Sequence, residues 1–340
     1  MQSPFRADQF WLEVQSCGGG GTVPKPGQTF HITHSILEGA GADVTLSPAM
    51  SMAKASFPSV CGDNEPQVGC TLGFGAVFSA QLLARAGFDY LMIDMEHNPL
   101  SARDASSMVH AIAAASGGKC KPVVRVPSHG VEWIKWALDS GAAGIIVPMV
   151  TSAAQVEQIV QHGTYPPRGQ RSFGPALAPF SGVDPTATVQ RYLHETSKTI
   201  SIIPMIESLE GYENAEAICS NDAISAVFIG PVDLRMSMGL AGGDGDEDRY
   251  LAILAHLVQL CHRASKPIGI FAAGMEACKK RANEGFDFLL VRSLGVMEPR
   301  PCPLTFSLAS RRSQPATRWS QQDSRRLQRW DPAGAAIRAG

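Results

Sequence analysis

Two acidic residues each end an apolar run in the second half of the chain. Glu207 ends SIIPMIE and Asp233 ends AVFIGPVD, with no Lys or Arg directly beside either. Because α/β proteins keep their chemistry at the carboxyl ends of parallel strands, two such acids from successive strands can share a divalent cation. Two carboxylates leave positions open for waters and a chelating substrate, which suits a hard cation such as Mg²⁺ or Mn²⁺, with Co²⁺ as a further candidate. The alternative is that each acid caps the helix that follows it.

A second group of polar residues follows earlier apolar runs. Asp94, Glu96 and His97 come directly after YLMI, and Arg125 lies inside PVVRV. Because a buried guanidinium needs a partner, we expect Arg125 to pair with Asp94 or Glu96, and it can also clamp an anion such as a developing enolate. His97 can act as a general base near neutral pH, whereas the alternative is a purely structural histidine.

The elements that would position these residues repeat a strand-then-helix order. Nearly continuous apolar runs are typical of parallel strands that are buried on both faces. Eight such runs, with helical patterns between most of them, favour an α/β fold of the (β/α)8 TIM-barrel type over an open sheet. The predicted strands are 67–72, 90–94, 122–126, 144–150, 201–206, 226–230, 267–272 and 286–291, and the predicted helices are 77–86, 102–115, 131–140, 153–162, 212–220, 250–264 and 275–284.

Composition divides the chain into three zones. Residues 1–66 are rich in Gly, Ser and Pro and predict an irregular N-terminal extension. Residues 67–297 carry the predicted barrel, and residues 298–340 form an arginine-rich C-terminal tail without a regular apolar stripe. We therefore expect a single barrel domain flanked by two irregular extensions.

Global composition argues against several classes of protein. Of the 340 residues, 44% are hydrophobic and 18% are charged, which is enough for a large core, and the net charge of −2 favours neither nucleic acid nor an anionic membrane. No apolar run approaches the roughly 20 residues of a membrane-spanning helix, and the N-terminus is a poor secretory signal. The eight cysteines form no C-x-x-C pair, so we expect reduced packing cysteines in a cytoplasmic protein.

Two further features bear on the chemistry. The segment YPPRGQRSFGPALAP (165–179) predicts a long loop of the kind that can cover an active site, or an ordinary surface loop. No lysine lies at the carboxyl end of a predicted strand, where a Schiff-base aldolase would need one. This argues against imine chemistry and favours a metal-assisted enolate, with no organic cofactor.

Six phrases, in this order, resemble the HpcH/HpaI aldolase family, the metal-dependent class II pyruvate aldolases of the phosphoenolpyruvate/pyruvate barrel superfamily. The phrases are AGFDYLMIDMEH, VVRV, ALDSGAAGIIVPMV, YPPRGQRSFGPA, IPMIES and FIGPVDL, and the similarity covers about residues 67–295. The resemblance implies that Glu207 and Asp233 bind the metal and that Arg125 stabilises the enolate oxygen. It also implies that His97 assists proton transfer together with Asp139 from an adjacent subunit.

The resemblance extends to the substrate site and to assembly. It implies that Gly230 and the backbone near Val232 and Asp233 hold the substrate carboxylate, while Asp94 and Glu96 support the residues around the metal. A homo-oligomer, either a trimer or a hexamer, is implied as well. The chain departs from the family at three places: Met205 stands where many members carry Gln, residues 1–66 show no clear counterpart of the family's first helix, and the 298–340 tail does not resemble the family's terminal helix.

The expected function is retro-aldol cleavage of a 4-hydroxy-2-oxo acid to pyruvate and an aldehyde. The substrate would be a 2-keto-3-deoxy sugar acid or a hydroxylated dicarboxylic 2-oxo acid from aromatic breakdown. One alternative is an oxaloacetate decarboxylase whose enolate adds to another acceptor, similar to macrophomate synthase. Another is a non-catalytic barrel that has lost its terminal helix, against which the intact acids, Arg125 and His97 argue.

Overall fold

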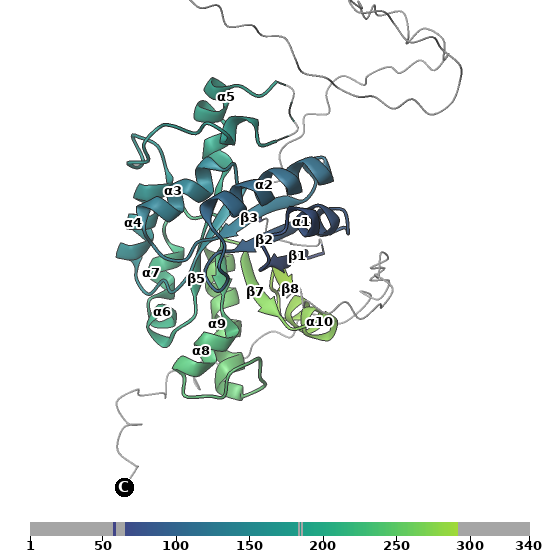
Figure 1. Ribbon diagram of the computed structural model, residues 1–340. Coiled ribbons are helices and arrows are strands. Elements are labelled where there is room, and N and C mark those ends of the chain that lie inside the picture. Colours follow the sequence, from purple (N-terminus) through teal and green to yellow (C-terminus); the bar gives the residue numbers. More distant parts are fainter. Residues whose placement is uncertain (1–56, 59–64, 183, 185, 292–340) are drawn as a thin grey trace, which may run out of the picture. The chain divides into compact units, whose positions relative to one another are not determined.

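The described part of the chain forms a closed barrel of eight parallel strands (Figure 1). This computed structural model describes residues 57–58, 65–182, 184 and 186–291, so the predictions made for 1–56, 59–64 and 292–340 lie outside it. Each strand pairs with the next in the chain and the last pairs with the first, which confirms the predicted TIM barrel. The strands are β1 (Gln67–Leu72), β2 (Tyr90–Asp94), β3 (Lys121–Arg125), β4 (Gly144–Val147), β5 (Ser201–Ile206), β6 (Val227–Ile229), β7 (Ile268–Ala272) and β8 (Phe288–Val291).

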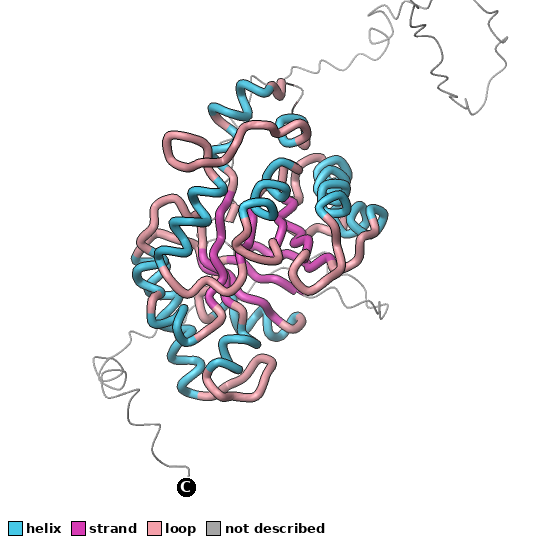
Figure 2. The backbone as a smooth tube through the Cα atoms, turned by 60° about the vertical axis from the view of Figure 1, so that its left-hand side comes forward, coloured by secondary structure: helices cyan, strands magenta, loops and turns pink. Residues whose placement is uncertain are grey.

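Helices surround the strands, as the turned view in Figure 2 also shows. Among the described helices, none has both the length and the apolar character needed to cross a membrane. The α-helices are α1 (Val77–Ala84), α2 (Ala102–Ser116), α3 (Val131–Asp139), α4 (Ala153–Gly163), α5 (Val189–His194), α6 (Leu209–Glu213), α7 (Ala215–Cys219), α8 (Pro231–Ser237), α9 (Asp248–Arg263) and α10 (Met275–Asn283), and two 3₁₀ turns are η2 (Ala178–Phe180) and η3 (Thr196–Thr199).

Local sequence signals explain where several helices begin and end. The Ser101 hydroxyl accepts the Asp104 N–H while the Asp104 carboxylate accepts the Ser101 N–H, a capping box that starts α2. Gly87 and Gly285 connect α1 to β2 and α10 to β8 with φ angles of 94° and 98°. Only glycine adopts these angles without strain, so both residues allow the sharp turn from helix to strand that the sequence predicted.

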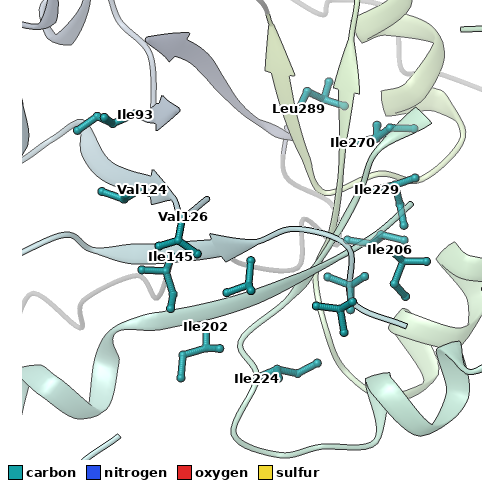
Figure 3. Close-up of a cluster of buried hydrophobic side chains, with 14 of the residues drawn as sticks. Ile93, Val124, Val126, Ile145, Ile202, Ile206, Ile224, Ile229, Ile270 and Leu289 are labelled. Carbon is teal, nitrogen blue, oxygen red and sulfur yellow. The ribbon is translucent and has the colours of Figure 1, made fainter. Parts of the chain in front are cut away.

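The core has two apolar layers because successive strand side chains point to opposite faces. One set fills the barrel, and the other packs between the barrel and the helices, where Figure 3 shows part of it. Burial on both faces explains why the strand sequences are almost entirely apolar. The inner set includes Met92, Val123, Ile146, Met205 and Phe228, and the outer set includes Ile93, Val124, Ile145, Ile229 and Leu289.

Phe57 closes the amino end of the barrel. Its ring lies 4.7 Å from the ring of Tyr90 and 6.1 Å from that of Phe288, measured between centroids. Its carbonyl accepts a hydrogen bond from Ser201, and its exposed fraction is 6%. Because Tyr90, Ser201 and Phe288 each begin a strand, the segment predicted as an irregular extension contributes at least one side chain to the barrel core.

The structure differs from the predicted elements on both sides of β5. Before β5, helix α5 and the 3₁₀ turns η2 and η3 were not predicted. The single helix predicted over 212–220 is two short helices, α6 and α7, that meet at Asn214. Helix α8, which begins at Pro231, was not predicted, and its N-cap Gly230 was interpreted as the end of the strand 226–230. Proline at the first helical position is favourable, since its missing N–H would have no partner there.

Candidate active site

Asp94 and Arg125 form the central ion pair at the carboxyl end of the barrel. They end β2 and β3 and face each other in the strand register. Arg125 donates from Nε to Asp94 Oδ1 at 2.8 Å, and its Nη2 lies 2.8 Å from Asp94 Oδ2. Burial opposes both charges, but the mutual hydrogen bond and attraction lower the pKa of Asp94 and raise that of Arg125. The predicted ion pair is confirmed.

Glu96 and His97 extend this pair toward the surface. Glu96 Oε2 lies 3.1 Å from Arg125 Nη1 and 3.7 Å from His97 Nε2. Burial, followed by the charges of Asp94 and Asp233, raises the pKa of Glu96 despite the attraction of Arg125. The His97 side chain is 64% exposed, so it is available to a molecule bound at this rim.

Glu207 follows β5 and is almost completely buried, with an exposed fraction of 3%. Its Oε1 accepts the N–H of Met149 at 2.7 Å. It does not cap α6, because the Ser208 hydroxyl accepts the Gly211 N–H instead, so that alternative is wrong for Glu207. Burial, followed by the charges of Glu96 and Asp233, raises its pKa to about 7. A nearby positive charge would stabilise the ionised form of a carboxyl group whose pKa is raised in this way.

Asp233 lies in the first turn of α8, just beyond the end of β6. A Cβ placed on Gly230 would come within 2.3 Å of Glu207 Oε2, so only glycine allows this close approach of β6 to the Glu207 carboxylate. The first backbone hydrogen bond of α8 runs from the Leu234 N–H to the Gly230 carbonyl. The N–H groups of Val232 and Asp233 come before it and therefore have no acceptor within the helix. The start of α8 thus presents the Asp233 carboxylate and the N–H groups of Val232 and Asp233 at the same rim as Glu207.

The charges at this rim do not balance. Four carboxylates, from Asp94, Glu96, Glu207 and Asp233, influence one another here, and Arg125 is the cation that opposes them. Excess oxygen ligands of this type fit a hard divalent cation. Within the residues that the structure describes, no three acidic, His or Cys side chains form a ready-made metal cluster. A cation here would therefore take few protein ligands and keep positions for water or substrate.

Asp139 lies apart from this group within one chain. It ends α3, which begins after β3 and runs back toward the amino end of the barrel, so it is far from the rim that carries His97. Its Oδ1 accepts a hydrogen bond of 2.6 Å from Nη2 of Arg171, whose side chain is 1% exposed. Arg171 also donates to the Tyr192 hydroxyl at 3.0 Å.

The 165–179 loop does not cover the rim of its own chain. Residues 164–168 line a cavity together with Ser201 and Pro267, which stand at or before the starts of β5 and β7. The prediction of an active-site lid is therefore wrong for the rim of the same chain. The cause is the order of elements, because a loop that follows a helix of a (β/α)8 barrel returns to the amino ends of the strands.

Two contributors to the site were missed. Asn98 donates a hydrogen bond from Nδ2 to Asp94 Oδ2 at 2.7 Å and so helps to hold the Asp94 carboxylate in place beside Arg125. Met149 lies inside the predicted strand 144–150, whereas it follows the end of β4 and its backbone N–H binds Glu207. Asn98 could have been found from its place in the post-strand loop, but no sequence signal indicates a backbone donor.

Comparison with known proteins decides the family. The family profile described as HpcH/HpaI aldolase/citrate lyase matches residues 76–292. The chain belongs to the HpcH/HpaI aldolase/citrate lyase family. It is an enzyme of the lyase class, an aldolase.

Two aldolases and one solved structure of this family are similar to the chain. The chain is 34% identical over 229 residues to a hydroxypyruvate/pyruvate aldolase of Chromohalobacter salexigens, covering 67% of this chain and 87% of that protein. It is 35% identical over 238 residues to a 4-hydroxy-2-oxo-heptane-1,7-dioate aldolase of Salmonella heidelberg, covering 70% and 88%. A crystal structure of an HpcH/HpaI aldolase/citrate lyase family protein from Burkholderia cenocepacia superposes with a TM-score of 0.61 at 30% identity, covering 67% and 88%.

Proposed function

We propose that this family member is a divalent-metal-dependent aldolase that cleaves a 4-hydroxy-2-oxo acid to pyruvate and an aldehyde. The observation that carries the proposal is the excess of buried negative charge around Arg125. Glu207, with a pKa raised to about 7 by burial and by Glu96 and Asp233, is destabilised as an anion until a cation joins it. We further propose that the enzyme acts in the cytoplasm as a homo-oligomer.

Glu207 and Asp233 would hold the cation, with Mg²⁺, Mn²⁺ and Co²⁺ as the candidates. Cleavage of a carbon–carbon bond beside a ketone leaves negative charge on the keto oxygen, and a bound cation supplies positive charge there. Arg125 adds a second positive charge, held in orientation by its two contacts with Asp94. Gly230 allows the backbone after β6 to lie close to the Glu207 carboxylate, and the backbone N–H groups of Val232 and Asp233, together with Gly230, would bind the substrate carboxylate.

His97 would move the proton. Its Nε2 would accept the proton of the 4-hydroxyl group as the carbon–carbon bond breaks, and the terminal carbon of the resulting enolate would then take up a proton to become the methyl group of pyruvate. Glu96 stands 3.7 Å from that nitrogen and would stabilise the protonated ring. Asp139 of an adjacent subunit would complete the proton-transfer pair, which makes activity depend on assembly.

Metal-dependent pyruvate release from the full-length protein tests this function. A 4-hydroxy-2-oxo acid should yield pyruvate with added Mg²⁺, Mn²⁺ or Co²⁺, and EDTA should abolish the activity. Glu207→Ala and Asp233→Ala should each lose at least about 100-fold in rate. Glu276→Ala, which changes an acid whose side chain is 87% exposed, is the matched control and should retain activity. Full activity of Asp233→Ala would refute the metal assignment.

The alternative, decarboxylation of oxaloacetate, would use the same enolate and the same residues. Comparing pyruvate release from oxaloacetate with release from a 4-hydroxy-2-oxo acid separates the two reactions. A clear preference for the hydroxy acid supports the aldolase. The absence of metal-dependent release from either substrate would support a non-catalytic barrel.

A further inference from the structure

Met149 has an unusual backbone conformation. In the part of the chain that the structure describes, Met149 and Ser265 are the non-glycine residues with positive φ, at 53° and 55°. Ser265 lies just beyond Ala264, the C-cap of α9, and donates its N–H to the His262 carbonyl at 3.0 Å, which is a common way for a helix to end. Met149 follows a strand, β4, so helix termination does not explain its conformation.

Packing does not explain it either. The Met149 side chain is 49% exposed, so the residue gains little from burial that would offset the cost of a left-handed backbone. A glycine at this position would adopt the same φ without strain. Strain of this type at a strand end, next to acidic side chains, is a reason to look for a functional contact.

The contact is with Glu207. The Met149 N–H reaches Glu207 Oε1 at 2.7 Å, and the next residue, Val150, donates its N–H to the Met205 carbonyl at 3.0 Å. The left-handed turn thus lets two consecutive N–H groups reach different acceptors. That of Met149 binds the side chain of Glu207, just after β5, and that of Val150 binds the backbone of β5. A hydrogen bond to an ionised carboxylate is stronger than one between neutral groups.

Glu207 is consequently held from both sides. Met149, after β4, binds Oε1, while the bare backbone of Gly230, after β6, borders Oε2. With the carboxylate between these two backbones, its rotation is restricted. The orientation of a metal-binding carboxylate set in this way is known to affect metal affinity.

We propose that Met149 is a positioning residue, whose left-handed backbone directs its N–H at Glu207 and so sets the carboxylate orientation that binds the divalent cation. The inference rests on the proposed function, because it assumes that Glu207 is a metal ligand. It predicts that metal affinity follows the ease with which residue 149 adopts the left-handed conformation. Glycine and asparagine adopt it readily, and β-branched valine does so poorly.

Mn²⁺ titration of the full-length protein tests the inference, with calorimetry or electron paramagnetic resonance as the readout. Met149→Val should bind Mn²⁺ about tenfold more weakly than Met149→Asn, and Met149→Gly should group with Asn. If the side chain acted only by packing, the order would be reversed, because valine resembles methionine more closely than asparagine or glycine does. Met275→Val, at a 42% exposed position on α10, is the matched control and should not change Mn²⁺ affinity.

Further arms keep the outcomes distinct. If Met149→Val does not fold, the Asn and Gly variants still distinguish the two roles of Met149. A packing role requires both variants to bind Mn²⁺ more weakly than Met275→Val, whereas a positioning role requires both to bind it at least as tightly. If Glu207→Ala loses Mn²⁺ binding but the Val variant binds as tightly as the Asn variant, the positioning role alone is overturned. If Glu207→Ala binds Mn²⁺ as tightly as the parent protein, the metal assignment fails and the inference fails with it.

Discussion

Asp94 and Arg125 are register partners on adjacent strands, and two contacts of 2.8 Å join their side chains. The pair uses Nε and Nη2 of the guanidinium and leaves Nη1 facing Glu96 at 3.1 Å. Because a guanidinium is planar, the two contacts with Asp94 fix the plane in which its remaining donors point. Asp94 therefore sets the orientation of the Arg125 guanidinium at this rim.

Asp94→Asn should destabilise the fold and reduce activity. The substitution keeps the shape of the side chain but removes the closest negative charge from Arg125, which is 12% exposed, and leaves Glu96 as its ion-pair partner at 3.1 Å. Removing one partner of a buried pair costs about 3 kcal/mol in the free energy of unfolding, which urea denaturation measures. Glu276→Gln breaks the exposed pair with Lys279 and should change that free energy by less than about 0.5 kcal/mol. Equal effects of the two variants would contradict the buried role of Asp94.

Phe57→Ala should destabilise the barrel as strongly as a core substitution, although residue 57 precedes the first strand. The ring packs against Tyr90 and Phe288 at the amino end, and its loss should cost about 3–5 kcal/mol in urea denaturation. Phe180→Ala, at a 56% exposed position, is the control and should cost less than about 0.5 kcal/mol. A small effect of Phe57→Ala would mean that the barrel closes without this residue.

The sequence predicted the parts of the fold and site that depend on short-range patterns. Apolar runs located all eight strands, because strands that are buried on both faces leave few polar positions inside them. The same pattern made Arg125 conspicuous, and the need of a buried charge for a partner predicted its pairing with Asp94 or Glu96, whereas the structure shows both contacts. The acids at the strand ends were found for the same reason.

The features that were missed depend on long-range geometry. The left-handed Met149 backbone accompanies a hydrogen bond to Glu207, 58 positions along the chain, and no local pattern around residue 149 indicates that contact. Helix α8 is seven residues long, too short for an apolar period to show, and its proline was consistent with either a turn or a helix start. The role of Phe57 likewise depends on strand starts that lie far apart in the sequence.

The metal-free protein should lose stability as pH rises through neutrality, because of Glu207. Its pKa is raised from 4.5 to about 7, mainly by burial. Between these values the folded state binds a proton that the unfolded state lacks, so acidification stabilises the fold and a rise in pH removes that gain. Unfolding free energies measured in EDTA from about pH 5 to about pH 8 should therefore fall more in the parent protein than in Glu207→Gln. Parallel curves for the two proteins would contradict the raised pKa.

Mixing two inactive variants should restore activity if Asp139 serves a neighbouring subunit. Asp139 and His97 lie at opposite ends of one barrel, and Arg171 holds Asp139 Oδ1 while the side chain remains 24% exposed. His97→Ala lacks the proton acceptor but retains Asp139, whereas Asp139→Ala retains an intact rim. In a mixed oligomer, the second variant's rim can receive Asp139 from the first. We therefore expect aldolase activity to appear after the two variants are dissociated together and reassembled.

A matched mixture shows whether such a recovery reports a shared site. His97→Ala combined with Glu207→Ala should stay inactive, because each rim still lacks one residue that the other chain cannot supply. Recovery in this control would indicate that rim residues themselves are exchanged between subunits. Conversely, no recovery from His97→Ala with Asp139→Ala, when native mass spectrometry detects the mixed oligomer, would contradict proton transfer between subunits and leave Asp139 with a structural role beside Arg171.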